Sequence, residues 1–239
     1  MRCALCHEDR ELRRSHIIPE FLHAAMYDET HRFWVVSADE SQRNAIKQKG
    51  EWERLLCEAC EDKFGKVERY ASLILKGGLP FKANRDGNLI FIEGIDYSKF
   101  KLFQLSILWR ASVSSRPLFE EVTLGPYEEQ ARQLLLRDDP GDPTEFGCVM
   151  WGITLVPGKT PGLIMQPVKA RIGNLITYKF VFGGFVWAYV ISKNEPKGAL
   201  RQCMLDRDGR AIIQVRGVEE MEDLSLFMAK VQKQGKLAR

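Results

Sequence analysis

The chain of 239 residues lacks the features of several large protein classes. Its most apolar stretch, residues 181–193, is too short to span a bilayer and contains two glycines. The beginning of the sequence is polar and has no apolar segment typical of a secretory signal. It has no P-loop, no glycine-rich dinucleotide motif and no nucleophile elbow. We therefore expect a cytoplasmic protein with no membrane partner.

A strong excess of charge of one sign is also missing. The formal net charge is +3 and the sequence pI is about 8.5, which does not by itself establish nucleic-acid binding. Hydrophobic residues make up 45% of the chain and charged residues 28%, as in an ordinary globular protein. A chain of this length buries a substantial core, either as one domain or as a small module beside a larger one.

Cysteine is sparse, but four of the six cysteines form two C-x-x-C pairs, Cys3 with Cys6 and Cys57 with Cys60. In a reducing compartment such pairs indicate metal binding before disulfides. Four thiolates complete the tetrahedral shell of Zn²⁺, so we predict one structural zinc ion. A redox pair is one alternative. Haem attachment is another, because His7 directly follows Cys6.

The hydrophobic pattern predicts an α+β protein with two parts, residues 1–78 and residues 79–239. The first part is a zinc module, and the second is an α+β domain with a mainly antiparallel sheet and flanking helices. Helices are expected over 20–28, from the second cysteine pair to residue 76, and over 97–115, 125–139 and 221–234. Strands are expected over 17–18, 32–37, 88–94, 146–156, 162–168, 174–182, 185–191 and 211–215, with 38–50 a loop and 206–210 a hairpin turn after 203–205. Cys148 and Cys203 are expected to be small buried hydrophobic residues.

The candidate catalytic residues lie around the second cysteine pair. His16 stands between the two pairs, and Glu61 and Glu68 follow the second pair at a spacing of seven residues. That spacing places both carboxylates on one face of a helix. A histidine can activate water and a carboxylate can hold a divalent cation, so the set favours metal-assisted phosphodiester hydrolysis.

The order C-x-x-C, then H-I-x-P, then L-L-C-x-x-C resembles the HNH endonuclease superfamily, the ββα-metal nucleases with a treble-clef zinc. The resemblance covers about residues 1–76. It implies that His16 is the general base, that Glu61 holds a catalytic Mg²⁺ or Mn²⁺ ion, and that DNA is the partner. Ser15 stands where the family often has an aspartate ligand, and no asparagine precedes the L-L-C segment. Glu68 is our candidate for the missing ligand.

Each candidate residue also has a simpler role. His16 could only hydrogen-bond at a strand end, Glu61 could only favour the first helical turn, and Glu68 could be solvated. The chain would then be a catalytically inactive zinc-stabilised module that binds nucleic acid or protein. A third hypothesis is an effector whose second part regulates a nuclease. For a nuclease, we expect DNA phosphates to meet three basic residues before His16, namely Arg10, Arg13 and Arg14.

Overall fold

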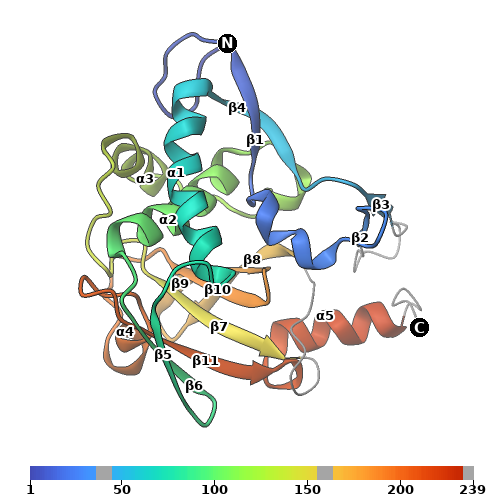
Figure 1. Ribbon diagram of the computed structural model, residues 1–239, viewed down its shortest axis with the longest axis vertical. Coiled ribbons are helices and arrows are strands. Elements are labelled where there is room, and N and C mark those ends of the chain that lie inside the picture. Colours follow the sequence, from blue (N-terminus) through green and yellow to red (C-terminus); the bar gives the residue numbers. More distant parts are fainter. Residues whose placement is uncertain (36–44, 155–163, 234–239) are drawn as a thin grey trace.

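Two segments far apart in the sequence pair at the N-terminal end of the computed structural model, which describes residues 1–35, 45–154 and 164–233. Strand β1 (Leu12–His16) runs antiparallel to β4 (Trp52–Cys57). Helix α1 (Glu58–Leu75) starts directly after β4 and lies beside the hairpin (Figure 1). The region therefore has a ββα arrangement in which the second cysteine pair opens the helix.

The segment between β1 and β4 differs from its sequence prediction. The expected helix over 20–28 is replaced by two 3₁₀ turns, Glu20–Leu22 and Ala24–Met26, and no side chain caps the first of them. A helix this short has little stability without a cap. The expected strand over 17–18 is not formed, since β1 ends at His16. The Ile17 N–H still donates to the Glu51 carbonyl at 3.1 Å, and Pro19, which has no N–H to donate, follows two residues later.

A two-stranded sheet lies next to these turns. It pairs β2 (Phe33–Val35) with β3 (Ala45–Lys47) in antiparallel register. Strand β2 lies within the strand predicted over 32–37, whose last two residues fall outside the described part of the chain. Strand β3 lies within the segment 38–50 that the sequence assigned to a loop, so that assignment was wrong at residues 45–47.

The second part of the chain contains a seven-stranded sheet with the order β5-β6-β11-β7-β10-β9-β8. Its strands are β5 (Lys82–Asp86), β6 (Leu89–Glu93), β7 (Cys148–Thr154), β8 (Met165–Ile172), β9 (Leu175–Phe182), β10 (Phe185–Val190) and β11 (Ala211–Gly217). All neighbours are antiparallel except β7 and β11. The predicted α+β class with a mainly antiparallel sheet is confirmed.

The turn at 206–210 forms, but it does not join two hairpin strands. Asp206 and Arg210 are linked through their backbones by a hydrogen bond of 2.9 Å. The residues before the turn follow helix α4 (Gly198–Gln202), and Met204 makes only an isolated bridge to Val149. Strand β11 pairs instead with β6 and β7. The hairpin prediction was wrong because the partners of β11 lie far away in sequence.

Helices cover both faces of this sheet, and Figure 1 shows α2 (Tyr97–Val113) between α1 and the sheet. Every side chain of α2 from residue 100 to residue 111 is buried. Helix α3 (Tyr127–Arg137) packs on α2, and α5 (Glu222–Lys233) lies on the opposite face of the sheet, where Leu224 meets Val186. The predicted helices over 97–115, 125–139 and 221–234 are confirmed to within a few residues.

One hydrophobic cluster joins the two predicted parts of the chain. Phe64 of α1 packs edge-on against Trp109 of α2, with ring centroids 6.2 Å apart. Helix α1 ends before Gly77, which has a left-handed φ of 73°. The boundary at residue 78 stays a prediction, and the core continues across it. Of the two isolated cysteines, Cys148 is buried as predicted and Cys203 is half-buried.

Candidate metal centre and the adjoining polar site

The four predicted zinc ligands come together at the start of α1. The sulfur atoms of Cys3, Cys6, Cys57 and Cys60 all lie within 4.8 Å of one another, and none forms a disulfide. Cys6 Sγ and Cys57 Sγ are 3.8 Å apart. A tetrahedral site with Zn–S bonds of about 2.3 Å separates its sulfurs by about 3.8 Å. The cluster therefore has the composition and spacing of a Cys₄ zinc site.

The backbone around the first cysteine pair prepares it for a cation. The Cys57 N–H donates to Cys3 Sγ at 3.3 Å, and the Ala4 N–H donates to the Leu55 carbonyl at 2.9 Å, which joins the first pair to β4. Burial raises the pKa of the Cys3 thiol, but several hydrogen bonds outweigh this effect and bring the pKa to about 7. Cys3 is therefore a ready zinc ligand, whereas burial raises the pKa of the Cys6 and Cys60 thiols, which would release their protons when the metal binds.

Ser15 and Glu61, the two positions at which the HNH resemblance places metal ligands, are in direct contact. Ser15 is fully buried on β1 and donates its hydroxyl hydrogen bond to Glu61 Oε1 in the first turn of α1. Burial raises the pKa of Glu61, and the bond from Ser15 acts in the opposite direction. A half-buried carboxylate beside a hydroxyl gives two oxygen donors for a hard cation.

The imidazole of His16 does not meet Glu61; its nearest carboxylate is Glu20. His16 Nε2 lies 3.3 Å from Glu20 Oε2, and Glu20 also accepts a hydrogen bond from the Tyr27 hydroxyl. Burial lowers the pKa of His16, while the charges of Glu20 and Glu68 act to raise it. The net lowering favours a neutral imidazole at pH 7, the form that can accept a proton. The sequence reasoning missed Glu20, whose only local signal is its position four residues after His16.

Glu68 pairs with Arg110, a residue of α2 that the sequence reasoning also missed. Arg110 Nη2 lies 2.6 Å from Glu68 Oε1, and the arginine side chain is only 2% exposed. The same guanidinium donates to the His16 carbonyl at 2.5 Å and lies over the Phe64 ring at 5.4 Å. The predicted face shared by Glu61 and Glu68 thus points at a buried arginine from the second part of the chain.

Three buried polar atoms of this site are held only by the ion-pair contacts given above and form no hydrogen bond of good geometry within the described part of the chain, namely His16 Nε2, Glu20 Oε2 and Glu68 Oε1. Among the same residues, the cysteines are the only group of three or more ligand atoms close enough to share an ion. Mg²⁺ usually binds through one or two carboxylates, with water and substrate phosphate supplying the rest. Ser15 and Glu61 meet that smaller requirement, whereas Glu68 already has a cationic partner.

Comparisons with family models, with curated proteins and with solved structures each found no match to the chain. In the described residues, no helix is long and apolar enough to cross a membrane. The cysteine cluster at the head of a ββα arrangement is the feature that connects the site to a known chemistry.

Proposed function

We propose that the chain is a metal-dependent HNH-like endonuclease that hydrolyses phosphodiester bonds in DNA. The observation that carries the proposal is the contact between Ser15 and Glu61 beside His16, at the end of a hairpin joined to α1 by four cysteines. These three residues stand at the ligand and general-base positions of the resembled family. The cysteines bind structural Zn²⁺ and set the position of the hairpin on the helix.

His16 is the proposed general base. Its Nε2 faces Glu20, which favours the tautomer with the proton on Nε2 and leaves a lone pair on Nδ1. A neutral imidazole takes the proton of the attacking water as the new phosphorus–oxygen bond forms. Glu20, itself bound by Tyr27, holds the ring in this orientation and stabilises the imidazolium that results.

Glu61, with the Ser15 hydroxyl, would hold the catalytic Mg²⁺ or Mn²⁺. That ion would supply neutralising charge for the phosphate and its leaving oxygen. Glu68 was our second candidate ligand, and its contact with Arg110 supports a different role for it. Glu68 orients Arg110, and Arg110 donates to the His16 carbonyl, so the pair positions the end of β1.

The test is cleavage of supercoiled plasmid by the purified full-length chain in Mg²⁺ and in Mn²⁺. We expect His16→Asn to lower the cleavage rate by a factor of about 10² to 10⁴, the usual contribution of a general base. The matched control is His7→Asn. His7 is exposed and has a left-handed φ of 63°, which asparagine tolerates. We expect this control to cleave at the wild-type rate.

Cleavage by His16→Asn at the wild-type rate would contradict the mechanism, as would the absence of wild-type cleavage in both metals. The second outcome would support the non-enzymatic alternative, a zinc-stabilised module that binds nucleic acid or protein. The observation that favours this alternative is the buried Arg110, because a built-in cation already neutralises one of the two carboxylates.

A further inference from the structure

The outer face of the β1–β4 hairpin places two arginines directly opposite each other. Arg14 pairs with Arg54 across the ladder, and the next pair on the same face is His16 with Trp52. Both arginines are exposed. Like charges at directly opposed positions destabilise a sheet. Arg14 lies over the Trp52 ring and Arg54 Nη1 donates to the Leu12 carbonyl at 2.8 Å, so both side chains are held in place, and an anion bound over the pair would offset their repulsion.

Trp52 and a third arginine extend this face. Arg14 Cζ lies 4.6 Å from the centre of the Trp52 ring, and Arg116 Cζ lies 5.6 Å from it. Arg116 Nε also donates to the Trp52 carbonyl at 2.8 Å, which holds this arginine against β4. We call Arg14, Trp52, Arg54 and Arg116 the arginine face.

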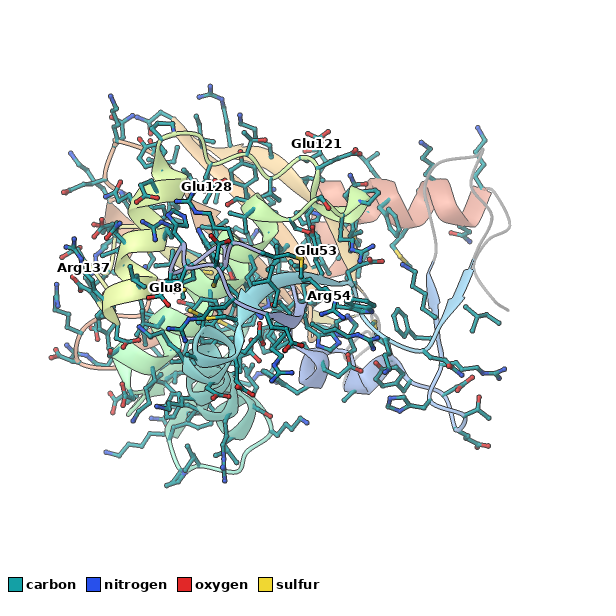
Figure 2. The ribbon with its side chains drawn as sticks, turned by 90° about the horizontal axis from the view of Figure 1, so that it is seen from above. Glu8, Glu53, Arg54, Glu121, Glu128 and Arg137 are labelled. Atoms are coloured by element: carbon teal, nitrogen blue, oxygen red, sulfur yellow. The ribbon has the colours of Figure 1, made fainter. Side chains whose placement is uncertain are left out.

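Among the described residues, the arginine face has no carboxylate in a direct ion pair. Within the described part of the chain, Arg14, Arg54 and Arg116 form no ion pair with an aspartate or glutamate. The nearest acidic residue on β4 is Glu53, which alternation places on the other face of the strand. Its carboxylate accepts hydrogen bonds from Ser114 and Ser115, and although burial acts to raise the pKa of Glu53, these bonds together with the charge of Arg116 lower it. Figure 2 shows Glu53 and Arg54 on β4, seen from above.

Two of the three arginines that the sequence suggested for phosphate contact are engaged elsewhere. Arg10 Nη2 lies 2.5 Å from Glu8 Oε2, and Arg13 Nη2 lies 2.7 Å from Glu58 Oε1. Of the three, Arg14 alone has no carboxylate partner among the described residues. The cationic surface beside His16 therefore comes from both strands of the hairpin and from the segment after α2.

We propose that the arginine face binds the phosphate backbone of duplex DNA without reading its sequence, an inference that rests on the proposed function for its link to His16. Guanidinium groups suit phosphate because they present several donors and are always charged. The Arg14–Arg54 pair is one ladder step from the His16–Trp52 pair, so a strand bound along this face leads to the general base.

The experiment measures binding of a short fluorescent DNA duplex by anisotropy in EDTA-free buffer without Mg²⁺ or Mn²⁺, over a series of salt concentrations. Each phosphate contact contributes about 0.9 to the slope of log affinity against log salt. We expect the double variant R14Q/R54Q to lower that slope by about 1.8 and to weaken binding at low salt. The matched control is Arg13→Gln. Arg13 is adjacent to Arg14, and its replacement removes one positive charge, as each substitution in the double variant does. We expect this control to keep the wild-type slope. Zinc content and melting temperature establish that each variant is folded.

This design distinguishes failure of DNA binding from failure of DNA cleavage. We expect His16→Asn to bind the duplex with the wild-type slope. If the wild-type protein binds the duplex with this salt dependence but does not cleave DNA, the proposed function is overturned and the arginine face is supported. A wild-type slope in R14Q/R54Q, or an equal loss in Arg13→Gln, would overturn the inference. Poly-L-glutamate that competes as well as an unlabelled duplex of equal charge would also overturn it, because the face would then serve an acidic protein.

Discussion

The two ends of α2 carry buried cations that serve different regions of the molecule. Near its C-terminal end, Arg110 meets a carboxylate, a carbonyl and a phenyl ring of the N-terminal region. Near its N-terminal end, Lys101 is just as deeply buried but donates only to the Phe146 carbonyl, at 2.8 Å, among the described residues. The first cation belongs to a polar network, whereas the second lies in the sheet region with a single carbonyl partner.

The surroundings of the two cations also differ in polarity. The sheet region packs aromatic rings, with Trp187 stacked on Phe182 at 5.0 Å and on Phe100 at 6.3 Å. The N-terminal region gathers sulfurs and charged groups around a short hairpin. Apolar burial therefore stabilises both regions, because one hydrophobic cluster runs through them, and the N-terminal region depends in addition on metal ligation and paired charge. Substitutions at the cysteines, at the two buried cations and at Ser15 can therefore separate the two regions.

The largest effect is expected from Cys57→Ser. Structural zinc contributes on the order of 10 kcal/mol to the folding of small zinc modules, so loss of a ligand removes most of what holds the hairpin to α1. We expect zinc to be lost and the amides of β1 and β4 to exchange rapidly with deuterium, while those of β7, β9 and β10 stay protected. The matched control is Cys203→Ser, which lies outside the cluster. Full zinc occupancy with an unchanged exchange pattern in Cys57→Ser would contradict this view.

Breaking the Glu68–Arg110 pair should have the next largest effect. Arg110→Met leaves Glu68 without its counter-charge and is expected to lower the free energy of unfolding by about 3–5 kcal/mol. The double variant E68M/R110M removes both charges and should recover a large part of that loss. Urea denaturation of the two single variants and the double variant measures the coupling. Additive losses would mean that the two residues do not act as a pair.

Lys101→Met tests the cation at the other end of α2. Burial lowers the pKa of Lys101 from 10.5 to about 8. Between these two values the unfolded chain binds more protons than the folded chain, so the free energy of unfolding rises with pH across this window, by at most about 3 kcal/mol. Lys101→Met should lack this rise. Parallel stability curves for the variant and the wild type from pH 8 to pH 10 would contradict the assignment.

Ser15→Ala should have the smallest effect on stability. It removes the hydrogen bond to Glu61, and a single hydrogen bond to a charged group contributes about 1.5–3 kcal/mol. We expect a loss near the lower figure in urea denaturation, because Glu61 can take a water in place of the hydroxyl. A variant with unchanged stability and unchanged cleavage would show that Ser15 has no part in the site.

The sequence predicted the features that depend on local pattern. The two C-x-x-C pairs indicated the sulfur cluster, and apolar spacing indicated α1, α2 and α3 with nearly correct ends. The start of α1 was predictable because the cysteine ligands fix it. Features of this kind follow from residue spacing within one segment, and that spacing can be read directly from the amino-acid sequence.

Features that depend on distant contacts were missed. Arg110 lies 94 residues after His16 and was hidden in a helix that reads as almost wholly apolar. The contact of Arg116 with Trp52 and the pairing of β11 with β6 and β7 were also missed, because the partners lie far apart in the sequence. The exposed basic run before His16 was also misleading, since Glu8 and Glu58 pair with two of its members. Contacts of this kind depend on the fold, and the hydrophobic periodicity of a single segment does not predict them.

The most direct test of the account is a metal count on the wild-type chain by native mass spectrometry, because both the fold of the N-terminal region and its proposed chemistry depend on the cysteine cluster. We expect one zinc ion per chain, with the mass reduced by the protons that the bound thiols release, and loss of that ion in Cys57→Ser. A wild-type chain that folds and melts cooperatively with no metal bound, or with iron in place of zinc, would contradict it.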